Sequence, residues 1–114
     1  MPTLRIALVQ ADPRVGDIAG NSEQVVDLTR QAYYRGAQLV AFPEMFLTGY
    51  PIEDLALRPS FVKASQHRVH TLALTLKRKG LGDVAVVVGH LAEAPNPEER
   101  DGTRRIAMNA ASVL

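Results

Sequence analysis

The run Leu39 to Phe42 constrains the fold more than any other stretch of this chain. Its four residues are apolar, and Pro43 ends it, because proline has no N–H to donate to a neighbouring strand. An earlier apolar run, Leu4 to Gln10, is separated from it by a segment with helical periodicity. Short, continuous aliphatic runs are typical of strands buried on both faces of a parallel sheet. The order strand, helix, strand therefore predicts a βαβ unit with parallel strands.

The segment between these two runs predicts an amphipathic helix from about Ser22 to Arg35. Asn21 is a suitable N-cap, with Gln24 three residues later as its capping-box partner, and Gly36 is a suitable terminator. The residues expected to face the sheet are Val25, Val26, Leu28, Ala32 and Tyr33.

A second long helix is predicted from about Phe61 to Lys79, with Ser60 as N-cap and Gly80 after its end. The basic run Lys77 to Lys79 falls in its last turn, where cations interact favourably with the helix dipole. A short helical stretch, Ile52 to Leu57, precedes it. The residues expected to face the sheet are Val62, Ser65, Val69, Leu72 and Leu76.

Two further strands are predicted, over Val84 to Gly89 and over Arg105 to Leu114. Between them, Ala94 to Thr103 reads as a polar, variable loop. The loop Ala11 to Gly20 carries neither glycine pattern of a phosphate-binding turn, which argues against nucleotide binding there. The whole pattern is that of an α/β protein with about four strands and two main helices.

The composition excludes several classes of function. At 114 residues, 46% of them hydrophobic, the chain is one domain or part of one. A net charge of +1 gives no electrostatic case for a nucleic acid or an anionic membrane as partner. The chain has no cysteine, so it can supply no disulfide, thiolate metal site or cysteine nucleophile. With neither a signal-peptide pattern nor an apolar run near the roughly 20 residues of a membrane span, we expect a cytoplasmic protein.

Glu44 is the main candidate for catalysis. It follows Pro43 at the carboxyl end of a predicted strand, where open α/β sheets place their ligand sites. The competing interpretation is a loop glutamate that points to water. Tyr50, in the turn Thr48 to Pro51, could line the same pocket, although tyrosines in such turns more often simply pack.

Three histidines are weaker candidates. His67 and His70 have the i, i+3 spacing of a metal-binding pair, but no third ligand lies nearby, so a solvated helix face is favoured. His90 follows a predicted strand and could border the site.

The other polar candidates have structural interpretations. None of the serines at 60, 65 and 112 has a nucleophile-elbow context. Asn109 falls inside the last predicted strand. A buried asparagine must satisfy its amide, so we expect Asn109 to be buried and to tie backbone near the site rather than contact substrate.

Taken together, the segments resemble the N-terminal part of a carbon–nitrogen hydrolase of the nitrilase superfamily. The resemblance is closest to the glutaminase domain of glutamine-dependent NAD+ synthetases, and it runs through the whole chain. Its carriers are the Leu39–Glu44 segment, the Gly-Tyr-Pro-Ile-Glu-Asp-Leu block within Thr48–Phe61, the first strand, Asn21, and Asn109–Leu114, which matches the strand preceding the family's catalytic lysine.

The resemblance implies a four-layer αββα sandwich and a Glu-Lys-Cys triad acting on L-glutamine. Glu44 matches the triad glutamate, a partly buried general base that takes the thiol proton, and Tyr50 matches a tyrosine of the glutamine pocket. The lysine, the cysteine and a synthetase domain that uses ATP and Mg2+ all belong beyond residue 114. We therefore expect an incomplete hydrolase domain that binds no metal or cofactor itself and is inactive alone, from an enzyme that is a homo-oligomer at full length.

Two alternatives remain open. One is the corresponding part of a free-standing amidase of the same superfamily. The other is a non-catalytic α/β module from a truncated product.

Overall fold

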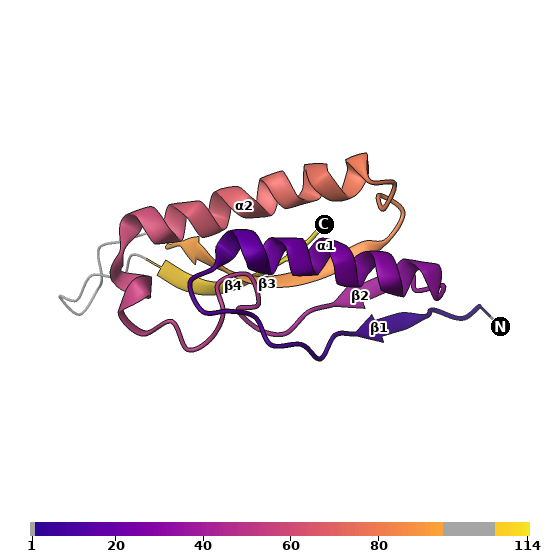
Figure 1. The fold of residues 1–114 in the computed structure, drawn as a ribbon, viewed down its shortest axis with the longest axis horizontal. Helices are drawn as coiled ribbons and strands as arrows, with labels where there is room; N and C mark the ends of the chain where they lie inside the picture. Colours follow the sequence, from indigo (N-terminus) through magenta and orange to yellow (C-terminus); the bar gives the residue numbers. More distant parts are fainter. Residues whose placement is uncertain (1, 95–106) are drawn as a thin grey trace.

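The computed structural model describes residues 2–94 and 107–114, which form an α/β fold (Figure 1). Its sheet has the order β1-β2-β3-β4, with β1, β2 and β3 parallel and β4 antiparallel to β3. The prediction of an α/β chain with four strands and two main helices is confirmed. The elements are β1 (Ile6–Leu8), α1 (Ile18–Tyr34), β2 (Leu39–Ala41), the 3-10 helix η1 (Glu53–Leu57), α2 (Pro59–Arg78), β3 (Ala85–Glu93) and β4 (Ala107–Val113).

Both helices pack on the same face of the sheet, where the main core lies (Figure 1). In the sheet row Ala7–Val40–Val86, the residues of β2 and β3 are fully buried against the helices. The core residues contributed by the helices and the sheet include Val25 and Val26 of α1, Val69, Leu72 and Leu76 of α2, and Val40, Val86 and Val88.

The opposite face of the sheet is apolar and largely uncovered by the described residues. One row runs across all four strands as Leu8–Ala41–Val87–Val113, and its two ends, Leu8 and Val113, are 76% and 72% exposed. The prediction that the first strand is buried on both faces is therefore wrong for this part of the chain. Of the four layers that the family resemblance implies, the described residues form one helix layer and one sheet.

The first helix begins earlier than predicted. Asp17 is its N-cap and accepts a hydrogen bond from the Gly20 N–H, so α1 starts at Ile18 rather than Ser22. Asn21 is not the cap, because its side chain is used for long-range contacts described below. At the other end, Gly36 has φ of +88°, which confirms it as the glycine that ends the helix.

The second helix matches its predicted buried face residue for residue. Val62, Ser65, Val69, Leu72 and Leu76 are all buried. Ser60 is not the N-cap: the helix begins at Pro59, whose fixed φ suits the first helical position, and the capping residue, Arg58, makes no side-chain capping bond. Lys77 and Arg78 lie in the last turn, as predicted, whereas Lys79 is the C-cap. Gly80 follows with φ of +77°, as predicted for the residue after the helix.

The last two strands differ from prediction in extent. β3 continues to Glu93 because residues from Val87 onward pair with β4, a continuation that the polar residues His90 and Glu93 concealed in the sequence. The predicted loop Ala94 to Thr103 and the start of the last predicted strand fall mostly on residues 95–106, which lie outside the described residues.

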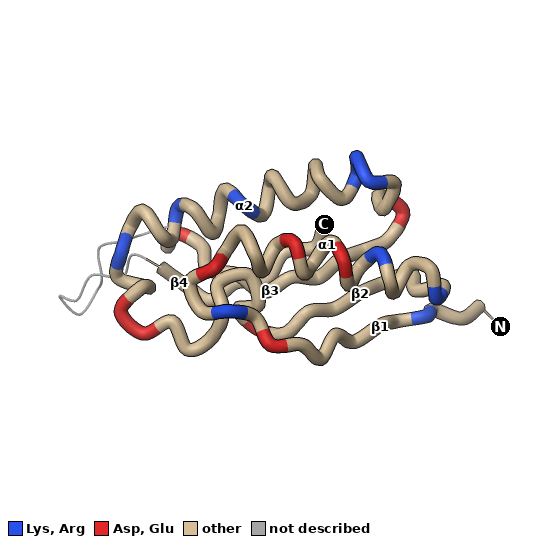
Figure 2. Tube along the Cα trace, viewed as in Figure 1, with Lys and Arg blue, Asp and Glu red and all other residues tan. Residues whose placement is uncertain are grey.

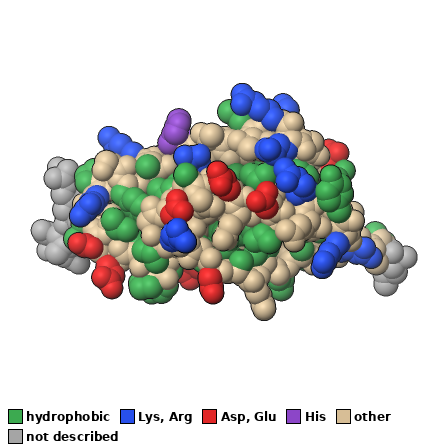
Figure 3. Space-filling model, viewed as in Figure 1, with side chains coloured by type: hydrophobic (Ala, Val, Ile, Leu, Met, Phe, Trp, Pro, Cys, Tyr) green, Lys and Arg blue, Asp and Glu red, His purple; other side chains and the backbone are tan. Residues whose placement is uncertain are grey.

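Charge is unevenly distributed along the molecule. Basic residues gather where α2 ends (Figure 2), while acidic and basic side chains are interspersed over the visible helical face (Figure 3). Among residues 2–94 and 107–114, no helix is both long enough and apolar enough to cross a membrane.

Candidate active site

Glu44 lies in a turn directly after β2. Its neighbours Met45, Phe46 and Leu47 point into the protein and are at most 7% exposed, whereas the Glu44 side chain is exposed. Two backbone hydrogen bonds hold this segment to β3: the Phe42 N–H donates to the Val87 carbonyl (2.9 Å) and the Leu47 N–H to the Gly89 carbonyl (3.0 Å). The glutamate is therefore presented to the surface by an anchored turn, and the expectation of a partly buried carboxylate is not met in this structure.

Gly89 makes this close approach possible. A Cβ at position 89 would overlap the backbone nitrogen of Met45 and would lie 2.7 Å from the Pro43 carbonyl oxygen. Because Gly89 has no side chain, the backbone of the Glu44 turn can pack directly against the backbone of β3. In the sequence, Gly89 stands only at the end of a predicted strand, and no local pattern indicates this role.

Asn109 of β4 contacts the Glu44 side chain directly. Its Nδ2 donates a hydrogen bond of 2.6 Å to Oε1 of Glu44. Asn109 was expected to be buried and to bind backbone; instead it is exposed and its partner is the candidate catalytic carboxylate. The antiparallel register of β3 and β4 places Asn109 opposite Leu91, and the Glu44 turn, which follows β2 and is bonded to β3, brings its carboxylate to Asn109.

Glu44 and Asn109 border an open hollow of about 370 Å³ on the uncovered face of the sheet. A carboxylate that is held by a neutral amide in such a hollow can accept a proton from a group placed above it. The other lining residues are small or apolar: Phe42, Val87, Gly89, Ala110 and Ala111.

Asn21 ties the Glu44 turn to the loop before α1. Its Nδ2 donates to the carbonyls of Leu47 (3.0 Å) and Arg14 (2.8 Å), and its Oδ1 accepts from the Arg14 N–H (2.8 Å). Asn21 is 1% exposed, so these bonds are shielded from water. The asparagine that was predicted to cap a helix instead joins two loops.

Tyr50 lies beyond this turn and is 69% exposed. It is not among the residues that line the hollow beside Glu44. Its assignment to a glutamine pocket therefore stays a prediction.

The remaining polar candidates lie away from the hollow. His67 and His70 are exposed on α2. His90 is buried, and its Nε2 lies 2.7 Å from the Ser112 hydroxyl. The Ser65 hydroxyl accepts a hydrogen bond from the Leu91 N–H. In the described part of the chain, no three His, Asp or Glu side chains come together as a metal site.

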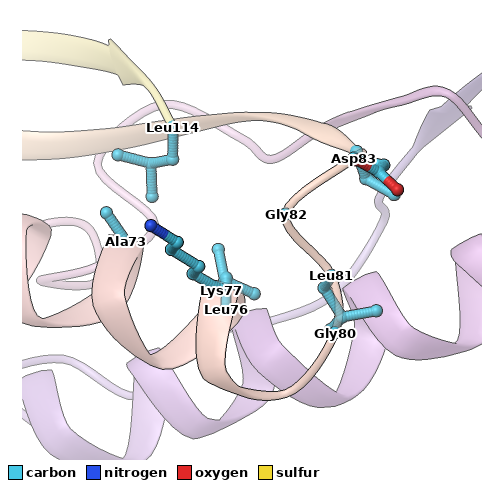
Figure 4. Close-up of a pocket in the computed structure, with 9 residues that line it drawn as sticks. Ala73, Leu76, Lys77, Gly80, Leu81, Gly82, Asp83 and Leu114 are labelled. Carbon is cyan, nitrogen blue, oxygen red and sulfur yellow. The ribbon is translucent and has the colours of Figure 1, made fainter.

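A larger cavity, of about 530 Å³, lies at the end of α2 and the start of β3 (Figure 4). Apolar side chains including Leu76, Leu81 and Leu114 line it, and Lys77 and Asp83 also border it. Its position beside Lys77 puts it outside the Glu44 hollow, with which it shares no residue.

The family model for carbon-nitrogen hydrolases matches residues 5–111, which is nearly the whole chain. The chain belongs to the carbon-nitrogen hydrolase family. Both Glu44 and Asn109 fall within the matched carbon-nitrogen hydrolase region.

Curated and solved relatives agree with this family. The chain is 37% identical over 108 residues to a glutamine-dependent NAD(+) synthetase from Synechocystis sp.. Its fold superposes on a glutamine-dependent NAD+ synthetase from Acinetobacter baumannii with a TM-score of 0.74 at 31% identity, over 100% of this chain. It spans only 18% and 19% of those two relatives, less than a fifth of either length.

A shorter relative, an amidase from the nitrilase superfamily, also has this fold. An amidase from Nesterenkonia sp. matches with a TM-score of 0.70 at 25% identity, over 97% of this chain and 38% of the amidase. That structure, of a glutamate-to-glutamine mutant, shows the acetamide moiety of fluoroacetamide bound covalently at the active-site cysteine.

Proposed function

We propose that this chain supplies the general base for cysteine-dependent hydrolysis of the side-chain amide of L-glutamine. The observation that carries the proposal is the Glu44 carboxylate, held by Asn109 in an open hollow at the end of a parallel strand. Membership of the carbon-nitrogen hydrolase family supports a hydrolytic reaction, and the glutamine-dependent relatives support glutamine as the amide.

The proposed chemistry needs a thiol and a cation from outside the 114 residues. Glu44 takes the proton of a cysteine thiol, and the thiolate attacks the amide carbon. A lysine stabilises the resulting oxyanion. As the C–N bond breaks, protonated Glu44 returns the proton to the leaving ammonia. Water then hydrolyses the thioester: Glu44 accepts a proton from the water, the C–S bond breaks to release glutamate, and Glu44 returns the proton to the cysteine thiolate. Tyr50 is proposed to line the glutamine pocket.

We propose that the chain acts as part of a longer polypeptide, as an incomplete hydrolase domain. It has no cysteine and hence no thiol nucleophile of its own, so the 114 residues alone should not hydrolyse glutamine. In the longer enzyme, the ammonia would amidate nicotinic acid adenine dinucleotide to NAD+ in a separate domain that uses ATP and Mg2+. This segment is proposed to bind no cofactor. The homo-oligomeric state and cytoplasmic location expected of that enzyme stay predictions.

A free-standing amidase is the second candidate. The chain superposes on the Nesterenkonia amidase with a TM-score of 0.70 and on the Acinetobacter synthetase with a TM-score of 0.74, so its fold fits either enzyme. It covers 38% of the amidase and 19% of the synthetase. The two candidates differ in what lies beyond the hydrolase domain, since only the synthetase needs an ATP site.

The coding sequence after Leu114 and an ammonia assay test these proposals together. We expect a lysine and then a cysteine in the continued domain, followed by an ATP-binding domain. We expect the longer polypeptide to release ammonia from L-glutamine and to form NAD+ with ATP, and the 114-residue chain to release none. Release from small aliphatic amides without any ATP-dependent product would favour the amidase. A coding sequence that stops at Leu114, or a continuation without a cysteine, would contradict both.

A further inference from the structure

We propose that Asn109 is a positioning residue: its amide fixes the Glu44 carboxylate in one orientation for proton transfer. This inference rests on the proposed function, because it concerns the base of that reaction. The contact is short, with 2.6 Å between Nδ2 of Asn109 and Oε1 of Glu44. It joins residues that are 65 positions apart in the sequence.

Both partners of this hydrogen bond are tied to β3, Glu44 through the turn that carries it and Asn109 through strand pairing. The Glu44 turn is anchored to β3 through the carbonyls of Val87 and Gly89. Asn109 lies within the β3–β4 ladder, opposite Leu91. The pairing of β4 with β3 and the anchoring of the Glu44 turn on β3 therefore set the distance between amide and carboxylate.

The glutamate needs such a restraint because its side chain is exposed. A free glutamate side chain samples several rotamers at small cost, and only some of them point a carboxylate oxygen toward a given neighbour. A single bond to Oε1 restricts that sampling. The bond from Asn109 engages Oε1, and Oε2 of the same carboxylate is not part of this contact.

An amide is chemically suited to this task. A lysine or arginine in the same place would stabilise the carboxylate electrostatically and oppose its protonation. The side-chain amide of asparagine does not titrate, so it orients Glu44 without competing for the proton that Glu44 must carry. The bond thus acts on geometry, to which proton-transfer steps are sensitive.

The test uses the longer polypeptide of the proposed function and measures kcat and KM for glutamine separately. We expect Asn109→Ala to lower kcat by about 10- to 100-fold while KM changes by less than about threefold, since positioning affects the chemical step. Asn109→Gln, which keeps the donor, should retain more of kcat than Asn109→Leu, which has a similar size and no donor. Asn109→Asp should be the least active, because it sets a second carboxylate against Glu44.

The controls separate this inference from the function on which it rests. The positioning role alone would be overturned by three results together: the wild type hydrolyses glutamine, Glu44→Gln is inactive, and Asn109→Ala keeps the wild-type kcat. A wild-type polypeptide that hydrolyses no amide would overturn the proposed function, and this inference with it. If Asn109→Ala does not fold, as judged by its thermal melt, the Gln and Leu variants decide: a higher kcat for Gln supports the positioning role, and equal kcat values overturn it.

Discussion

The backbone of Met45 lies directly against Gly89, so closely that a Cβ on residue 89 would overlap the Met45 nitrogen. This contact places the Glu44 turn on β3 and within reach of Asn109 on β4. The site thus depends on a missing side chain as well as on the two that are present.

Gly89→Ala should displace the Glu44 turn. The added methyl meets backbone that cannot rotate away, since the Pro43 carbonyl oxygen would lie 2.7 Å from it. We expect a loss of about 1–3 kcal/mol in the free energy of unfolding and, in the longer polypeptide, a marked loss of glutamine hydrolysis. Gly82→Ala is the matched control, because its nearest neighbour would be 3.9 Å away. Denaturant unfolding of both variants measures this, and equal stabilities would contradict the role assigned to Gly89.

Asn21→Ala should weaken the contact between the loop that precedes α1 and the turn that follows β2. It removes three hydrogen bonds in a site that is 1% exposed and leaves the Leu47 carbonyl without its side-chain donor. We expect a destabilisation of about 2–4 kcal/mol, measured by urea unfolding. Ser60→Ala, at an exposed position that caps no helix, should change stability by less than about 0.5 kcal/mol. Similar effects of the two substitutions would show that Asn21 is not the joining residue.

The uncovered sheet face should make the 114-residue chain associate with itself. Leu8 and Val113, at the two ends of one row across the sheet, expose large apolar side chains. We expect the double substitution Leu8→Lys and Val113→Lys to shift the chain toward monomer in sedimentation velocity. Leu74→Lys is the control, because Leu74 is 55% exposed but lies on α2, over the other face. A wild-type chain that is fully monomeric, or an equal effect of Leu74→Lys, would contradict this account.

Local patterns predicted the elements of this fold well. The five buried residues of α2 follow helical spacing, which depends only on neighbouring residues, and each was predicted. The prediction failed for residues whose side chains act over long distances. Asn21 has the chemistry of an N-cap, and nothing near it in the sequence shows that its amide binds Leu47. Asp17 took the capping role instead.

Of the candidate site, Glu44 could be predicted from the sequence, but its contacts could not, because they join residues that are far apart in the chain. Glu44 follows a strand end, and that position is visible in the sequence. Its contact with Asn109 depends on the register between β3 and β4, which the sequence does not show. Asn109 was expected to be buried, but no described residue covers its side chain. The close approach at Gly89 depends on how the Glu44 turn folds back, which composition and spacing do not specify.

The most direct test of the account is ammonia release from L-glutamine by the longer polypeptide carrying Glu44→Gln. Glutamine keeps the size of the side chain and can still contact Asn109, but it cannot take the thiol proton. We expect turnover to fall by about 10²- to 10⁴-fold, while Glu23→Gln, at an exposed position on α1, leaves it unchanged. Undiminished turnover in Glu44→Gln, with an active wild type, would contradict the assignment of Glu44 as the general base.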